Sequence, residues 1–359
     1  MGPVFPHYRM ALELPTLRIG LAGFSLEQQE TLRQMLQQEK ATRQVWEFAK
    51  PEDADALCIN GARTQVLPDG MMRIASGVPA GRSLLLDPSG LNRPAAFVLP
   101  VPHNFPPYLT FVLEPNSVAL ALREMEILLR PVIAQFCLAS QILEQEAALG
   151  SGVYHVSRAD GTRIALVDLR GDVGVLTSAS TMDFDDALWT PHPRTAEAMP
   201  QHFYRCSLSH LMWQYAMRTT RDILPTRYRT EQLYFRRAPR LPQRLLADSH
   251  LLLMRELATE PGTFNDLQQR TQLPPTQLAT DLAALYLVGA ITSNPKRAAP
   301  IVSQPHELLS ENGPATQQAY DAAREDPSLS TRSGPATVTN APQGRRADRT
   351  APAPMQLDH

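Results

Sequence analysis

The sequence is short of lysine and cysteine and has no long apolar run. Lysine occurs only at positions 40, 50 and 296, so nearly every cation is an arginine, whose planar guanidinium suits carboxylates and phosphates. The three cysteines lie far apart without a C-x-x-C pair for zinc or redox chemistry, and their odd number fits a reducing cytoplasm. No run approaches the ~20 apolar residues of a membrane span. Proline and charge interrupt the first residues, so we expect no signal peptide there.

The sequence also lacks the common catalytic motifs. It has no P-loop, no G-x-G-x-x-G, no G-x-S-x-G and no H-E-x-x-H. Asp183, Asp185 and Asp186 lack the glycine and the distal glutamate of a calcium loop, so we expect them at the N-terminus of a helix. The sequence therefore predicts a protein that is not an enzyme and holds no metal.

The 359 residues suffice for several domains, and changes in composition and pattern divide them. We expect an N-terminal arm (1–15), an α/β domain (16–130), a connecting helix (131–150), a middle domain of β-hairpin and helix with a basic connector (151–245), a helical unit (246–295) and a tail (296–359). The tail is rich in Ala, Pro, Ser, Thr and Gln, so we expect it to be disordered.

Short apolar runs alternate with polar helical stretches in the first domain. We expect strands at 17–24, 43–49, 55–61, 83–87 and 95–100, and helices at 25–40 and 116–130. Ser25 should cap the first helix, with Gln28 at the capping-box position. This alternation predicts a parallel α/β sheet.

The same region resembles a response-regulator receiver domain, by its strand order and by Leu99-Pro100 where the family has a lysine-proline pair. The resemblance implies a flavodoxin-like fold and a phosphorylation site. Phe24 and Ser25 stand where the family has an acidic pair, Asn60 replaces the phospho-accepting aspartate, and Leu99 replaces the lysine. Without these groups magnesium and a phosphoryl group are not held, so the resemblance implies a pseudo-receiver. The alternative is an unrelated small α/β domain.

The middle and C-terminal parts predict an α+β arrangement. The turn at residues 159–161 joins two alternating strands and Gly171 precedes a third, so we expect a small antiparallel sheet, followed by a helix over 207–221. Three helices between Asp248 and Gly289, and a short strand after them, resemble a winged-helix domain.

The third of these helices determines whether the unit reads DNA. Its outward positions should be Thr276, Gln277, Thr280, Asp281 and Ala284. No Lys or Arg occurs from 271 to 295, and 245–295 contains two arginines against five acids, a net charge of −3. DNA binding needs several cations, so we expect this unit to contact protein rather than nucleic acid.

One stretch is strongly basic. From Arg205 to Arg255 there are ten arginines against three acids, a net charge of +7, and "YFRRAPRLPQRLL" (234–246) contains no acid. Its prolines forbid a regular helix, so we expect an extended connector. The candidate binding residues are Tyr234, Arg236, Arg237, Arg240 and Arg244.

Three partners remain open for these arginines. The pair Arg236-Arg237 beside an aromatic residue is similar to the arginine sites of cyclic di-GMP receptors, which implies a guanine nucleotide ligand. A nucleic acid would suit the same arginines as a nucleotide does, and the two form one possibility. An acidic protein surface is the second possibility, and ion pairing with the acidic helical unit at a domain junction is the third. Our prediction is a bacterial cytoplasmic signalling adaptor without a cofactor that acts by binding other proteins. The alternatives are a cyclic di-GMP receptor and a DNA-binding transcription regulator.

Overall fold

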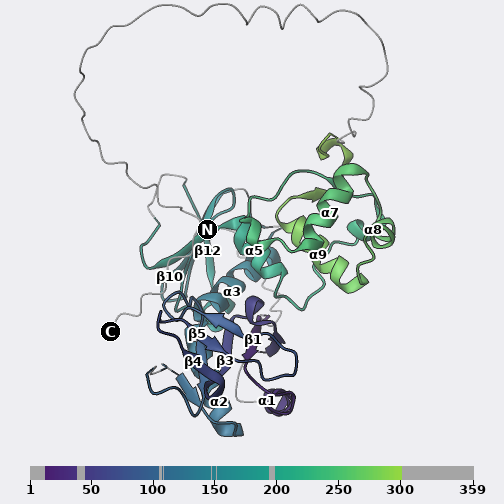
Figure 1. Cartoon of the computed structure of the whole chain (residues 1–359). Helices are drawn as coiled ribbons and strands as arrows, with labels where there is room; N and C mark the ends of the chain where they lie inside the picture. The colour runs from purple at the N-terminus through teal and green to yellow at the C-terminus, as the bar shows by residue number, and fades with distance from the viewer. Residues whose placement is uncertain are drawn as a thin grey trace, which may run out of the picture. The chain divides into compact units, whose positions relative to one another are not determined.

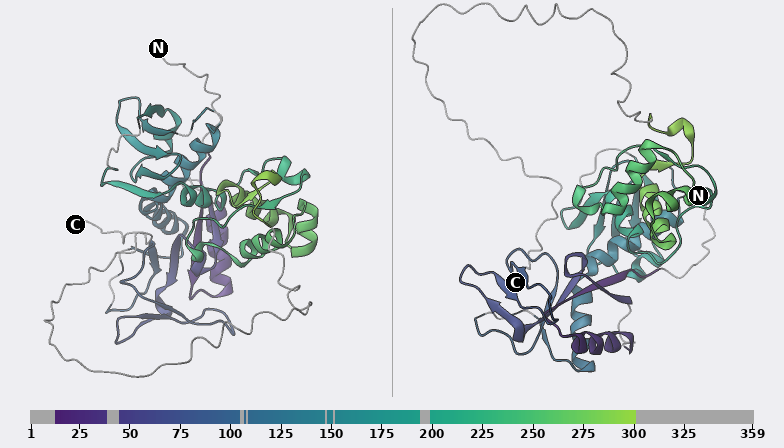
Figure 2. Two further views of the ribbon diagram at one scale, coloured as in Figure 1. Left: turned by 90° about the horizontal axis from the view of Figure 1, so that it is seen from above. Right: turned by 45° about the vertical axis from the view of Figure 1, so that its right-hand side comes forward.

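The computed structural model describes residues 13–38, 45–104, 107, 109–146, 148–150, 152–193 and 199–300 (Figure 1). The described residues up to Ala299 belong to one compact unit. Both views of Figure 2 show three groups of elements in it: N-terminal strands in purple and blue, middle strands in teal and C-terminal helices in green. Residues 1–12 of the expected arm, and the expected tail from residue 301 onward, lie outside the described residues.

The N-terminal group contains a five-stranded sheet in which every pairing is parallel, with the strand order β2-β1-β3-β7-β8. Its members are β1 (Thr16–Ala22), β2 (Val45–Ala49), β3 (Ala56–Asn60), β7 (Ala95–Val98) and β8 (Leu109–Phe111). The order, with the second parallel strand outside the first, is compatible with a flavodoxin-like fold. The expected parallel α/β sheet is therefore confirmed, with β8 as a strand that the sequence did not predict.

Helices cover one face of this sheet and a small antiparallel sheet covers the other. The covering elements are α1 (Leu26–Gln38), α2 (Pro115–Leu128), β4 (Thr64–Val66), β5 (Met72–Ile74) and β6 (Leu84–Leu86). Leu32 of α1 and Leu122 of α2 are buried in the core on the helical face, and Met72 of β5 packs with Phe97 on the other. Ser25 and Gln28 form the expected capping box of α1.

The strand expected at 83–87 does not join the parallel sheet. It is β6, which pairs antiparallel with β5. The parallel neighbour of β3 is β7, and the crossover between them contains no α-helix but the three short antiparallel strands β4, β5 and β6. Instead Gly70, with φ of 84°, turns the chain directly from β4 into β5.

The middle group is a second sheet, wholly antiparallel, with the order β12-β9-β10-β11-β13. Its strands are β9 (Val153–Ser157), β10 (Arg163–Asp168), β11 (Asp172–Leu176), β12 (Leu188–His192) and β13 (Phe203–Ser207). The first three were expected, whereas the two edge strands were not. Against this sheet packs α3 (Arg130–Glu144), which follows α2 after a break at Leu129 and buries nine of its 15 residues. The expected connecting helix is therefore a core helix.

The acids of residues 183–186 divide between the two ends of a short helix, α4 (Thr181–Asp185). Asp183 forms a capping box with Ser180 and an ion pair with Arg158, with 2.7 Å between Oδ1 and Nε. Asp185 and Asp186 lie at the C-terminal end, because the helix has only five residues. The expectation of an N-terminal acid is thus right for Asp183 and wrong for the other two.

The C-terminal group is mainly helical. It contains α5 (Leu208–Ala216), α6 (Arg227–Thr230), β14 (Tyr234–Phe235), α7 (Asp248–Thr259), α8 (Phe264–Thr271), α9 (Pro275–Leu287) and β15 (Ile291–Thr292). The short 3₁₀ helices of the unit are η1 (Pro51–Asp53), η2 (Gly61–Arg63), η3 (Gln243–Leu245) and η4 (Pro295–Arg297). Ser207 caps α5, and Thr263 and Asp266 form a capping box on α8. The helix expected over 207–221 ends at Ala216.

Two expectations about this group are wrong. The tail was expected to begin at Lys296, but η4 lies within the compact unit, and the N–H of Ala299 donates to the carbonyl of Phe235 at 2.9 Å. In α9, Thr276, Gln277 and Thr280 are exposed as expected, whereas Asp281 and Ala284 are buried. The reason is that α9 packs against both α5 and α7, so a second face of the helix is covered.

Candidate functional site

The arginine pair of the basic stretch is held by the end of α9. Gly289, with φ of 67°, follows the helix, and the N–H of Ala290 donates to the carbonyl of Leu285 at 2.8 Å, the pattern of a Schellman cap. The carbonyl of Ala290 then accepts from the N–H groups of Arg236 (2.8 Å) and Arg237 (3.3 Å). Two residues adjacent in sequence are thereby fixed to a helix terminus more than fifty positions away.

Both guanidinium groups of this pair lie beside Gly289. A methyl group at position 289 would be 3.3 Å from Nη2 of Arg237 and 3.4 Å from Nη1 of Arg236. Arg237 is exposed and Arg236 is partly exposed. No acidic side chain of the described residues forms an ion pair with either of them, which leaves both charges available to an external anion.

The rest of the basic stretch departs from the expected extended connector. Tyr234 and Phe235 are extended because they form β14, which pairs antiparallel with β15. Arg244, however, lies in the 3₁₀ helix η3, so it does not continue an extended row with Arg236 and Arg240. Burial, and then the charge of Arg244, lower the pKa of His210, which places Arg244 toward α5. The five candidate residues are therefore not all on one strand.

A second candidate site lies at the carboxyl ends of the parallel strands. A hollow of about 530 Å³ opens there, lined by Ser25, Glu27, Gln28, Asn60, Ala62, Arg63, Val98, Leu99, Pro100, Val112 and Leu113. This edge, beside the point where strand order reverses, is where open α/β sheets bind ligands. Ser25, Asn60 and Leu99, three of the four residues assigned to the degenerate phosphorylation site, line this hollow. Phe24 is buried in the core, with 1% of its surface exposed, and does not line the hollow.

Asn60 is a structural residue within that hollow. Its side chain is buried, and the amide nitrogen lies 3.2 Å from the carbonyl of Gly23 and 3.3 Å from Oε1 of Gln28. Its Oδ1 accepts from the N–H of Ala62 at 3.2 Å. Asn60 therefore ties the end of β3 to the loop after β1 and to α1, and its amide is not a nucleophile for a phosphoryl group. Glu27 is the one carboxylate among the described residues that line the hollow.

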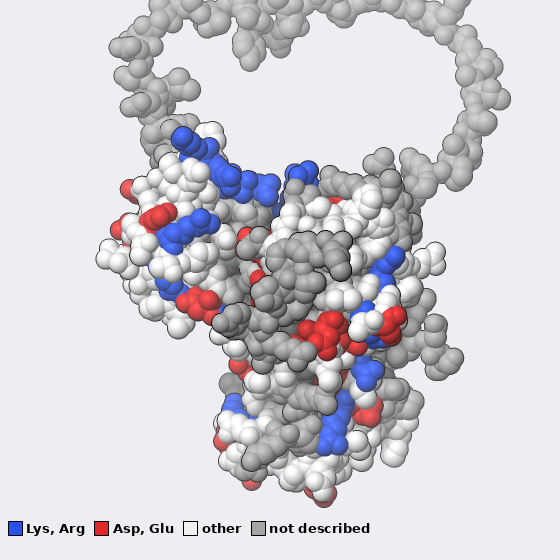
Figure 3. Space-filling model, turned by 180° about the vertical axis from the view of Figure 1, so that it is seen from behind, with Lys and Arg blue, Asp and Glu red and all other residues white. Residues whose placement is uncertain are grey.

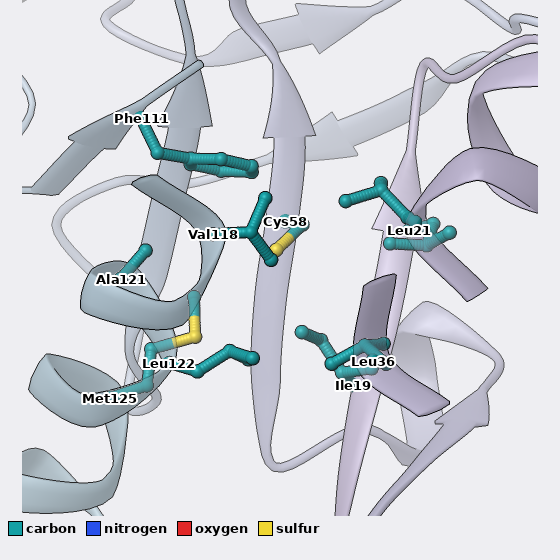
Figure 4. A pocket seen from close by; sticks show the side chains of 10 residues that line it. Ile19, Leu21, Leu36, Cys58, Phe111, Val118, Ala121, Leu122 and Met125 are labelled. Carbon is teal, nitrogen blue, oxygen red and sulfur yellow. The ribbon is translucent and has the colours of Figure 1, made fainter. Parts of the chain in front are cut away.

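The apolar cavity in the core offers no further site. Leu21, Leu36, Cys58, Phe111 and other apolar residues line it between β1, β3, α1 and α2, as Figure 4 shows. Its volume is about 10 Å³, close to that of a single water, and its lining has no polar group to hold one. It is a small packing defect.

The cysteines are placed for packing. Burial raises the pKa of the Cys58, Cys137 and Cys206 thiols to about 12, so none is a thiolate at neutral pH. The described residues contain no group of three or more His, Cys, Asp or Glu side chains that could hold a metal ion.

The candidate surfaces are thus a cationic pair at the end of α9 and a largely uncharged hollow at the sheet edge. Among the described residues, no single helix has the length and apolar character to cross a membrane; α2 and α3 meet that test only as a pair bent by 62°. Comparisons of the chain with known protein families, with curated proteins and with solved structures found no match.

Proposed function

We propose that this chain is a non-catalytic regulatory adaptor whose receiver-like N-terminal domain does not accept a phosphoryl group. The observation that carries the proposal is the buried, fully hydrogen-bonded amide of Asn60 at the position of the phospho-acceptor. A carboxylate there would be needed both as nucleophile and as a magnesium ligand. Leu99, 47% exposed at the rim of the hollow, supplies no cation to meet a phosphoryl group.

The test is incubation of the full chain with acetyl phosphate and magnesium, followed by intact mass and peptide mapping. We expect no added phosphoryl group at Asn60 or at Ser25. The Asn60→Asp variant is the matched comparison, because it restores the phospho-acceptor carboxylate but neither the acidic pair nor the lysine of the receiver family. A stable phosphorylated species of the unaltered chain, mapped to the hollow, would refute the proposal.

A second candidate function is reception of a guanine nucleotide second messenger such as cyclic di-GMP. The specific observation in its favour is the placement of both guanidinium groups beside Gly289 without an acidic partner among the described residues. Planar arginine forks bind phosphate and stack on purine rings. Arg236→Ala and Arg237→Ala should each weaken such binding at least tenfold, about 1.4 kcal/mol, in calorimetric titration with cyclic di-GMP, whereas Arg240→Ala should not.

The burial of Asp281 changes the argument about DNA recognition by α9. The aspartate does not face a DNA groove, because it points at His250 inside the C-terminal group. The lack of Lys and Arg from 271 to 295 remains, and the exposed residues of α9 are the uncharged Pro275, Thr276, Gln277 and Thr280. A winged-helix-like unit with this third helix is better suited to contacts with protein than to sequence-specific reading of DNA.

A further inference from the structure

Two basic segments that are far apart in the sequence meet at one small sheet. Arg236 and Arg237 follow β14, and Lys296 and Arg297 follow β15, with which β14 pairs through Phe235 and Ile291. We propose that these four residues, the basic strip, bind the phosphodiester backbone of a nucleic acid without reading its base sequence. The proposal goes beyond the adaptor function and does not depend on it.

The backbone of the second segment is fixed to the first. Beyond β15, Oδ1 of Asn294 accepts from the N–H of Lys296 at 3.0 Å and starts η4. The chain then returns, and the N–H of Ala299 donates to the carbonyl of Phe235 at 2.9 Å, directly before Arg236. The four cations are therefore held around one two-stranded sheet rather than on independent loops.

The charge of the strip is uninterrupted. No acid occurs from 232 to 247 or from 282 to 306 of the sequence, so both segments carry only positive charge. Lys296, Arg297 and Arg237 are exposed, and no acid of the described residues forms an ion pair with them. In Figure 3 a band of Lys and Arg side chains, without Asp or Glu inside it, crosses the upper left, on the part of the molecule that carries α7, α8 and α9 in Figure 1.

A surface of this kind fits a polyanion with evenly repeated charge. A nucleic acid strand presents one phosphate per ~3.4 Å of axis whatever its sequence, whereas a polypeptide would need a run of consecutive acidic residues. Three of the four cations are arginines, which bind phosphate oxygens in a bidentate manner. Cations that meet only phosphates carry no sequence information.

The geometry of α9 separates this strip from the helix face that would read bases. The strip lies at Gly289, after the C-terminus of α9, while the exposed Thr276, Gln277 and Thr280 lie in its first two turns. Nine to thirteen residues at 1.5 Å each place these side chains about 14 to 20 Å from Gly289 along the helix. Binding through the strip therefore leaves the bases unread.

The experiment measures fluorescence anisotropy of the full chain with a labelled random-sequence DNA duplex of about 20 base pairs between 50 and 200 mM salt. If all four cations neutralise phosphates, affinity should fall about a hundredfold over that range. The Lys296→Ala/Arg297→Ala variant should reduce the fall to about tenfold, because two counterions fewer are released.

The control variant is Arg33→Ala/Arg255→Ala, which removes the same charge from two exposed sites outside the strip. It should retain the salt dependence of the unaltered chain, and a second duplex of unrelated sequence should bind equally well. The proposal would be overturned if both variants reduced the salt dependence of DNA binding equally. It would also be overturned if polyglutamate displaced the labelled duplex as effectively as unlabelled DNA of the same charge, since the partner would then be an acidic polypeptide.

Discussion

The residue that differs most from its expected environment is Asp281. Its side chain is 4% exposed, and Oδ1 lies 3.2 Å from Nε2 of His250, which is itself 1% exposed. The Nδ1 of His250 accepts from the N–H of Ala247 at 3.0 Å, so Nε2 is the nitrogen that carries the ring proton, although neither Nε2 nor Oδ2 of Asp281 makes a hydrogen bond with the described residues. The ring of Trp213 from α5 packs on the other side of the imidazole, 4.6 Å between centroids. One polar pair thus joins α5, α7 and α9.

Removal of Asp281 should destabilise the C-terminal group strongly. In Asp281→Ala the buried imidazole of His250 loses the carboxylate that lies beside its Nε2, and removing the polar neighbour of a buried group typically costs about 1–3 kcal/mol. Asp281→Asn keeps an acceptor and should cost less. Urea denaturation measures both, with Gln277→Ala on the exposed face of α9 as a control that should change stability by less than about 0.5 kcal/mol. A cost for Asp281→Ala as small as that of the control would contradict this account.

At the scale of elements, Gly289, the left-handed residue that follows α9, lies beside two arginines of the basic strip. Gly289→Ala places a Cβ on a left-handed residue, which costs about 1–2 kcal/mol, and the new methyl group presses on the guanidinium groups of Arg236 and Arg237. Gly70→Ala is a matched control, because Gly70 also has positive φ (84°) but has no atom within 4 Å of the added methyl.

Thermal denaturation should show a similar loss of stability for both glycine variants, while only Gly289→Ala should weaken anion binding. The anion assay is the salt-dependent duplex titration used for the basic strip. If Gly70→Ala impaired anion binding equally, the effect of Gly289→Ala would come from lowered stability and not from displaced arginines.

Sequence patterns identified the longer helices and strands. They missed strands too short to show a period and pairings between segments far apart in the sequence. β1 and α1 were predicted because a buried run of seven residues and a capped helix of thirteen are long enough to show a period. β4, β5 and β8 have three residues each, too few to display alternation. The pairing of the two-residue strands β14 and β15 leaves no local signal, so the arrangement of both basic segments around one small sheet was not predictable.

The candidate site at the sheet edge was predictable for a topological reason. The residues after parallel strands gather at one edge, so Ser25, Asn60 and Leu99 line the same hollow. The exposed face of α9 was predictable only in part. A single apolar stripe indicates one covered face, but α5 covers a second, and the small side chain of Ala284 gives little indication of it.

At the scale of the molecule, one short segment after α5 connects the helical group to the parallel sheet. Arg218 binds Asp55, at the start of β3, with both guanidinium nitrogens, at 2.5 and 2.6 Å. Oδ2 of the same carboxylate accepts from the N–H of Arg18 in β1 at 2.9 Å. Nearby, the carboxylate of Glu13 accepts from the N–H of Thr220 at 2.8 Å. The contacts of Arg218 and Thr220 join residues more than 160 positions apart. The N–H groups of residues 217–219 still bond back to Trp213 and Tyr215 of α5, and the N–H of Thr220 is the first that turns to Glu13 instead.

The last prediction concerns this connection. The Arg218 and Asp55 side chains are only 13% and 10% exposed, so Arg218→Ala leaves a largely buried carboxylate without its main partner and should cost about 3–5 kcal/mol. Arg218→Lys keeps the charge but loses the planar guanidinium fork, so its loss of stability should lie between zero and that of Arg218→Ala. Arg205→Ala is the matched control: Arg205 contacts Asp172 through two nitrogens but is 64% exposed, so its loss should cost less than about 1 kcal/mol.

A double-mutant cycle with Asp55→Ala separates the pair from its surroundings, and urea denaturation supplies the four free energies. Hydrogen exchange gives a local readout, because the amide of Thr220 should exchange faster in Arg218→Ala once the segment after α5 is released from the sheet. A coupling energy between Arg218 and Asp55 no larger than that between Arg205 and Asp172 would mean that the segment is held by Glu13 and packing alone. The helical group would then be joined to the sheet through α3 and α5 rather than through this ion pair.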